Sequence, residues 1–163
     1  MDNGIANFEI QPGNILKIFP KKESLNLSKL WMDVFCKNKQ GANTKTYLWH
    51  IFCCDRYPHL SRDDAEKEYK QQQAPEYIVL ANNCKFAVLT DSLPEYCNLT
   101  DYYIFPPNLA WTMAFTHEDG WLDGPYFAVH PNYQKLNEEN LEQIKKNFRK
   151  NREIENARRN GWL

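Results

Sequence analysis

The chain has 163 residues, a length that suits one domain or one domain with an appendage. Leu, Ile, Val and Phe together account for 37 of them, which is enough to bury a core and excludes wholesale disorder. The net charge of −1 argues against a basic nucleic-acid-binding protein and against an acidic tail.

The first third of the chain predicts a strand, a helix and a second strand. Four of the five residues at 15–19 are apolar, and the segment ends before Pro20, which is typical of a short strand. Ser24 is placed to cap a helix that runs to about Lys37, because apolar residues follow it at spacings of three and one. Residues 47–54 are apolar on both faces and predict a strand covered on both sides, although a buried helical turn has the same pattern.

The middle of the chain predicts a helix followed by antiparallel strands. Residues 61–73 begin with Ser61 and an acidic first turn and carry Lys later, as a helix does. Residues 77–81 and 84–90 flank an Asn-Asn pair and predict a hairpin. Another strand is expected at residues 102–105, before two prolines.

The last part predicts one more strand pair and a long helix. Residues 111–116 and 126–130 form the pair, joined by a connection longer than a tight turn needs. Asn137 is placed to cap the helix, and Gly161 to end it. The clustered hairpins indicate an α+β fold: an antiparallel or mixed central sheet with helices on one face and a long C-terminal helix. We expect one domain over residues 1–135, followed by a helix and tail over residues 136–163.

The distal half of that C-terminal helix has two interpretations. Its apolar stripe weakens after Phe148, which is typical of a solvated helix end. The alternative is that Ile154, Trp162 and Leu163 dock on a second chain, which would make the protein a self-associating homodimer.

The near-neutral total hides an uneven distribution of charge. Residues 86–134 contain no Lys or Arg but six acids, whereas residues 1–85 carry a net +2 and residues 135–163 a net +3. Either these strands are the buried centre of the sheet, or the acids form a surface for a basic partner with aromatic anchors. The six acids are Asp91, Glu95, Asp101, Glu118, Asp119 and Asp123.

Targeting and thiol chemistry favour a reduced compartment. Residues 1–10 have neither a basic nor an apolar signal-peptide region, and no apolar run is long enough for a membrane span. Five cysteines, an odd number that includes the adjacent Cys53 and Cys54, argue against a disulfide framework. We therefore expect a cytoplasmic protein that binds neither membranes nor nucleic acid.

Histidines supply the only candidate acid–base groups. His50, His117 and Glu118 are candidates for a ligand or acid–base site, but none lies in a zinc-ligand spacing. His50 in an apolar segment is more typical of a core histidine than of a catalyst, and buried structural thiols are the better interpretation of Cys53 and Cys54. The sequence has no Gly-rich phosphate loop. It therefore predicts no metal and no cofactor.

Three segments resemble a family of small bacterial proteins known as domain of unknown function 4275. They are Tyr-Leu-Trp-His-Ile-Phe at residues 47–52, Ala-Glu-Lys-Glu-Tyr at residues 65–69, and a run at residues 111–127 with Trp, Thr-His-Glu and Gly-Pro-Tyr-Phe in order. The resemblance spans about residues 30–127 and implies no reaction or cofactor. Small α+β proteins of this kind are similar in character to immunity proteins of bacterial toxin systems, which is an analogy of class.

We therefore expect a protein-binding module, of the kind that neutralises a toxin, rather than an enzyme. The partner has a basic surface, and the contact residues lie in the acidic, aromatic part of the chain. The alternatives are a small enzyme or ligand-binding domain that uses His50, His117 and Glu118, and a self-associating structural domain. The expected contact residues are Glu118, Asp119, Trp121, Asp123, Asp101 and Tyr126.

Overall fold

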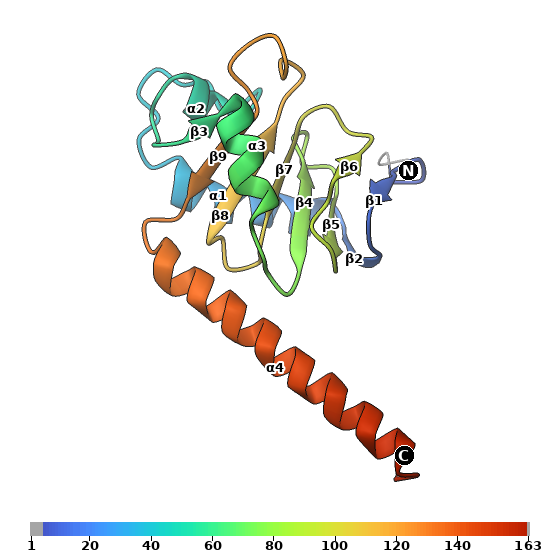
Figure 1. Cartoon of the computed structure of the whole chain (residues 1–163). Helices are drawn as coiled ribbons and strands as arrows, with labels where there is room; N and C mark the ends of the chain where they lie inside the picture. Colours follow the sequence, from blue (N-terminus) through green and yellow to red (C-terminus); the bar gives the residue numbers. More distant parts are fainter. Residues whose placement is uncertain (1–4, 163) are drawn as a thin grey trace.

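A seven-stranded antiparallel sheet forms the centre of the protein (Figure 1). The computed structural model describes residues 5–162. Residues 1–4, which belong to the predicted signal-free N-terminus, and Leu163, a predicted docking residue, lie outside it. The sheet has the strand order β2-β5-β4-β7-β8-β9-β3, and β1 pairs separately with β6. The strands are β1 (Ile10–Gln11), β2 (Ile15–Phe19), β3 (Leu60–Ser61), β4 (Tyr77–Ala81), β5 (Ala87–Thr90), β6 (Tyr96–Cys97), β7 (Tyr102–Phe105), β8 (Trp111–Phe115) and β9 (Tyr126–Val129). The helices are α1 (Lys21–Phe35), α2 (His50–Cys53), α3 (Arg62–Lys70) and α4 (Tyr133–Arg159).

The α+β fold and the antiparallel sheet are confirmed, but helices cover both faces of the sheet. Successive residues of a strand point to opposite faces, and β8 shows the division. Ala114 belongs to the core that contains Trp31 of α1 and Phe52 of α2, whereas Met113 belongs to the core that contains Tyr69 of α3. The placement of all helices on one face was therefore wrong, because strands buried on both sides need cover on both sides.

The first helix begins earlier than expected. Pro20 occupies the N-cap position, where its fixed φ and missing N–H suit a helix start. Ser24 therefore lies within the first turn, and its hydroxyl donates to the carbonyl of Phe19 instead of capping the helix. The indole N–H of Trp31 donates to Thr112 Oγ1 at 2.8 Å, which fastens α1 to the centre of the sheet.

Residues 47–54 form turns and the short helix α2, so the predicted strand is wrong. Sheet residues satisfy the backbone of this segment from the side: Trp49 N–H donates to the Tyr103 hydroxyl at 3.0 Å. Ile51 and Phe52 are fully buried against the α1 face of the sheet. The two-sided apolar pattern arises from this burial and not from a place in the sheet.

The remaining elements follow the predictions with shifted ends. Helix α3 and the paired strands β4–β5 and β8–β9 form where they were expected. Helix α4 begins four residues before Asn137, with Asn132 at its N-cap, and the chain turns at Gly161, which has a φ of +73°. Among its described side chains only Asn140 is buried, and α4 extends away from the sheet (Figure 1). No helix within residues 5–162 is long and apolar enough to cross a membrane.

Candidate protein-binding surface

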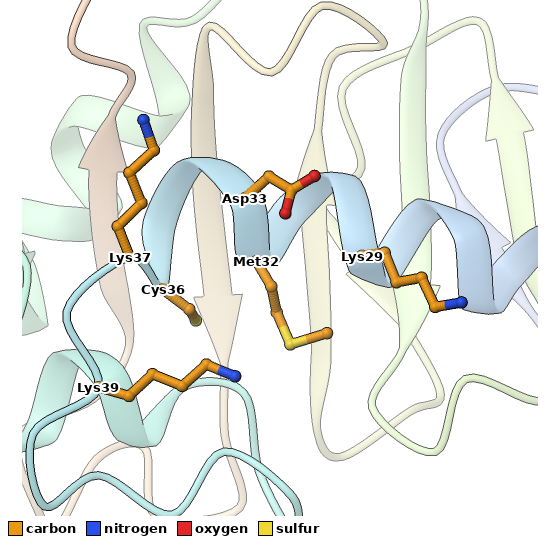
Figure 2. Close-up of a pocket in the computed structure, with 6 residues that line it drawn as sticks. All are labelled: Lys29, Met32, Asp33, Cys36, Lys37 and Lys39. Carbon is orange, nitrogen blue, oxygen red and sulfur yellow. The ribbon is translucent and has the colours of Figure 1, made fainter.

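A hollow beside α1 collects basic side chains (Figure 2). It has a volume of about 580 Å³, and Cys36 lies buried beneath it. Burial raises the pKa of Cys36 to about 11, so at neutral pH this thiol keeps its proton and is not a nucleophile. The hollow therefore presents ammonium groups and apolar atoms. Its lining residues are Lys29, Met32, Asp33, Cys36, Lys37 and Lys39.

The acids gather elsewhere, on the loop of residues 116–125 between β8 and β9. Asp119 braces this loop from within: its carboxylate accepts the backbone N–H of Thr116 at 3.0 Å and the Thr116 hydroxyl at 2.8 Å. Burial raises the pKa of Asp119 in spite of these two hydrogen bonds. The expected contact residue Asp119 is thus a structural support of the loop and not a free surface charge.

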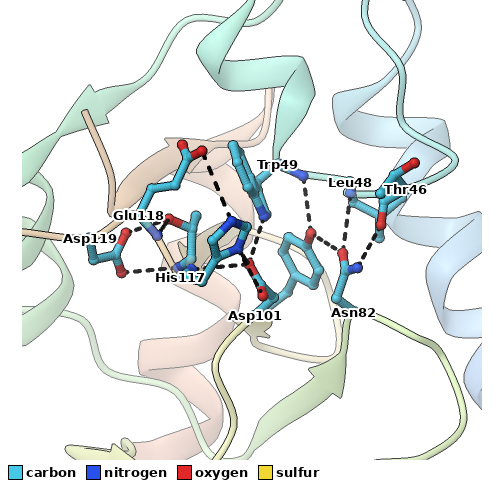
Figure 3. Close-up of polar contacts among 10 residues, drawn as sticks. Thr46, Leu48, Trp49, Asn82, Asp101, His117, Glu118 and Asp119 are labelled. Atoms are coloured by element: carbon cyan, nitrogen blue, oxygen red, sulfur yellow. Dashed lines mark hydrogen bonds and ion pairs between the residues drawn. The ribbon is translucent and has the colours of Figure 1, made fainter. Parts of the chain in front are cut away.

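Asp101, which precedes β7, ties the loop to the segment before α2 (Figure 3). Its carboxylate accepts the backbone N–H of His117 at 3.1 Å, the Nδ1–H of His117 at 3.0 Å and the indole N–H of Trp49 at 3.0 Å. The hydrogen bond to Asp101 raises the pKa of His117. Asp101 is therefore a hub that fixes two loops at the same end of the sheet.

Asn82 is a second hub, which the sequence reasoning missed (Figure 3). Its amide oxygen accepts the Tyr103 hydroxyl at 2.6 Å and the backbone N–H of Leu48 at 3.3 Å, while its amide nitrogen donates to the Thr46 carbonyl at 2.8 Å. The only signal was the Asn-Asn pair, which predicted a turn. An Asn at a turn gives no indication of which distant segment its side chain will bind.

The outer part of the loop exposes apolar residues above this rigid base. Trp121 is 70% exposed, and Leu122 beside it is also exposed. They line a hollow of about 290 Å³ between the loop and the start of α3. Asp123 pairs with Arg62 of α3 at 3.1 Å. We call this region the acidic loop surface; it consists of Glu118, Trp121, Leu122 and Asp123 of the loop and Asp63 and Glu66 of α3.

The structure separates the expected contact residues into two groups. Trp121 and Asp123 are exposed and Glu118 is partly exposed, so all three are available to a partner. Asp119 and Asp101 instead support the loop, and Tyr126 is buried against Phe52 with 2% exposure. The other two acids of the acidic segment lie apart. Asp91 accepts hydrogen bonds from Asn14, and the backbone N–H of Glu95 donates to Gln11.

The three candidate acid–base residues do not form one hydrogen-bonded set. His117 Nε2 lies 4.0 Å from Glu118, but His50 Nδ1 donates instead to the carbonyl of Asn43 at 2.7 Å. The rings of His50 and His117 both approach Tyr47, with centroids 5.4 and 5.1 Å away. The arrangement is thus an aromatic cluster in which each imidazole already has a structural partner.

The adjacent thiols of Cys53 and Cys54 lie close to Glu118 and Asp123 of the acidic loop surface. Cys53 and Cys54 are exposed, so their interpretation as buried thiols is wrong, and their sulfur atoms are 4.0 Å apart. Partial desolvation of its sulfur, followed by the effects of Cys54 and nearby acids, raises the pKa of Cys53 to about 12, which suppresses its thiolate. All five cysteines are free, and no group of three or more potential metal-binding side chains is found within residues 5–162.

Comparison with known proteins gives one match. Residues 24–127 match the model of the family described as "Domain of unknown function (DUF4275)", which is more than half of the chain. The chain belongs to this family. The matched DUF4275 region runs from α1 to β9, so it contains the acidic loop surface and leaves out α4. No curated protein and no solved structure matches the chain.

Proposed function

We propose that this DUF4275 protein is a binding module that docks a partner protein with a basic surface on the acidic loop surface. The observation that carries the proposal is the exposure of Trp121 on a braced loop. Tryptophan is enriched among the residues that contribute most to protein interfaces. A loop held by Asp101 and Asp119 loses little further conformational entropy when a partner binds.

The negative charge of the acidic loop surface is the reason to expect a basic partner. The hollow beside Trp121 is lined by Asp63 and Glu66, and Arg62 is the only basic residue among its lining residues. Glu118 and Asp123 add negative charge on the loop side. A surface of this kind attracts a basic partner, accelerates their encounter and disfavours acidic proteins.

The class of partner that we propose is a bacterial toxin, in particular a nuclease whose basic nucleic-acid-binding surface this protein would cover. The DUF4275 protein would then be an immunity-type inhibitor. We place this encounter in the cytoplasm, where free thiols remain reduced. A second observation supports a binding role: His50 and His117 each hydrogen-bond to a different residue, Asn43 and Asp101, and not to a common acid–base partner.

Affinity capture from the native host, read by quantitative mass spectrometry, tests the proposal with three baits. They are the wild type, the surface variant Trp121→Ala/Asp123→Lys, and a matched control, Leu30→Ala/Asp33→Lys. The control also truncates one exposed apolar side chain and reverses one exposed acid, but on α1. We expect a basic protein to be retained by the wild type and the control and lost from the surface variant. Equal recovery on all three baits would refute the proposal.

A further inference from the structure

An apolar stripe on α4 lies outside the domain and has no partner within residues 5–162. Phe148 is 68% exposed and Leu141 is 37% exposed, with Ile144 between them partly exposed. A helix of 27 residues is about 40 Å long, and most of α4 extends beyond the sheet (Figure 1). An isolated helix with an apolar stripe normally buries that stripe against another element.

Helix α4 contacts its own domain through the flank of the helix that adjoins Ile144. The hydroxyl of Tyr133 donates to Gln72 at 3.2 Å, and the amide of Asn140 donates to Asn108 at 3.2 Å. Farther along α4, Asn147 lines a hollow together with Pro75 and Pro107 of the domain. Asn140 and Asn147 adjoin Ile144 on one flank of the stripe, whereas Leu141 and Phe148 lie on the other flank and stay exposed.

The spacing of the stripe is that of a coiled coil. Leu141, Ile144 and Phe148 are separated by three and four residues, so they occupy successive a, d and a positions of a heptad. The next d positions on either side are Asn137 and Asn151. A short apolar centre with polar core positions at its ends is a pattern that fixes register at a cost in stability.

We propose that α4 pairs with α4 of a second copy of this chain as an antiparallel coiled coil. The dyad lies at Lys146, the midpoint of Tyr133–Arg159, so the two helices overlap along their whole length. In this register Ile144 packs against Phe148 of the second copy, and Leu141 faces its Asn151. The two domains, each joined to the start of its α4, then lie toward opposite ends of the helix pair.

Charge selects the antiparallel orientation. The flanking e positions are Glu138, Lys145 and Arg152. In an antiparallel pair Glu138 lies opposite Arg152 of the second copy, and the symmetry produces this attraction twice against one Lys145–Lys145 repulsion. A parallel pair would instead place the basic run of residues 145–152 against itself. The acidic loop surface takes no part in this contact, so the dimer and the proposed function stand or fall separately.

Sedimentation of the full chain tests the dimer. With only three apolar residues from each helix in its core, we expect a dissociation constant of about 1–100 µM. Phe148→Glu should weaken association at least about tenfold, since it places two carboxylates at the dyad core. Asn156→Glu, which adds the same charge on the outward face, should leave association unchanged. A monomer at about 0.1 mM wild type, or equal effects of the two variants, would overturn the proposal.

The register has its own tests. Glu138→Arg and Arg152→Glu should each weaken association, and the double variant should restore it. In a Cys53→Ser/Cys54→Ser background, a short bis-maleimide should link Lys145→Cys copies to each other. Glu153→Cys copies should not link, because their positions lie about 21 Å apart along the helix pair. Linking at Glu153 instead of Lys145, or no restoration in the double variant, would contradict the antiparallel register.

Discussion

At the scale of single residues, the acids near the surface have two different tasks. Asp119 and Asp101 accept two and three hydrogen bonds that hold loops in place, whereas Asp123 is exposed and pairs only with Arg62. A count of acidic residues does not distinguish these two roles. The partly buried Asp101 and Asp119 shape the loop, and the exposed Asp123 is available to attract a partner.

Asp119→Ala should therefore destabilise the protein more than Asp123→Ala. Removing Asp119 leaves the Thr116 N–H and hydroxyl without their acceptors, at a cost of about 1–3 kcal/mol. Removing Asp123 breaks an exposed ion pair worth about 1 kcal/mol or less. Urea denaturation of both variants measures the difference. Equal losses would show that Asp119 does not brace the loop.

His117 should make stability depend on pH. Asp101 raises the folded-state pKa of His117 above its ordinary value of 6.5, so folding favours the protonated ring. The stabilisation is complete below the pKa of the unfolded chain and is lost as the pH rises through the raised folded pKa. The advantage of the wild type over His117→Gln should thus be larger at about pH 5.5 than at about pH 8.5. Urea unfolding at both pH values checks this; an advantage independent of pH would contradict the ion pair.

At the scale of elements, the sequence predicted what periodicity and turn residues control. Residues 15–19, of which four are apolar, are bounded by Pro20, and they form β2 as expected. The prediction of a strand at residues 47–54 was wrong because an apolar pattern on both faces indicates burial and not backbone conformation. Their helical turns depend on backbone N–H groups that donate to Asn82 and Tyr103, which are more than 30 residues away in the chain.

The site was predictable to a similar extent. The missing basic residues and the position of Trp121 in a loop indicated the surface. The inward role of Asp119 and the burial of Tyr126 depend on side-chain direction, which loop sequences do not specify. The sequence also could not predict which face of the sheet α3 covers, because a helix that buries Ala65 and Tyr69 can pack on either face.

The distal half of α4 should contribute little to the stability of the domain. Its side-chain hydrogen bonds to the rest of the domain lie in its first half, from Tyr133 to Gln72 and from Asn140 to Asn108. Truncation after Asn147 should change the free energy of unfolding by less than about 1 kcal/mol, as for other exposed sites. Urea denaturation at concentrations where the full chain is monomeric measures this. A loss above about 2 kcal/mol would mean that the distal helix packs on its own domain.

At the scale of the whole molecule, a net charge of −1 describes none of its surfaces. The acidic loop surface lies at one end of the sheet, three lysines line the hollow beside α1, and eight basic residues lie in residues 135–163. The DUF4275 match includes the acidic surface and excludes α4. The molecule thus offers two separate regions for association: an acidic one within the family domain and a helical one outside it.

The most direct measurement of the central claim is a calorimetric titration of the captured basic partner with wild type, Trp121→Ala and Leu30→Ala. Truncating an aromatic anchor at the centre of an interface typically costs about 2 kcal/mol or more, so Trp121→Ala should bind at least about tenfold more weakly. Leu30→Ala, which also truncates an exposed apolar residue, but on α1, should bind as the wild type does. Equal affinities of wild type and Trp121→Ala would contradict the claim that the acidic loop surface is the docking site.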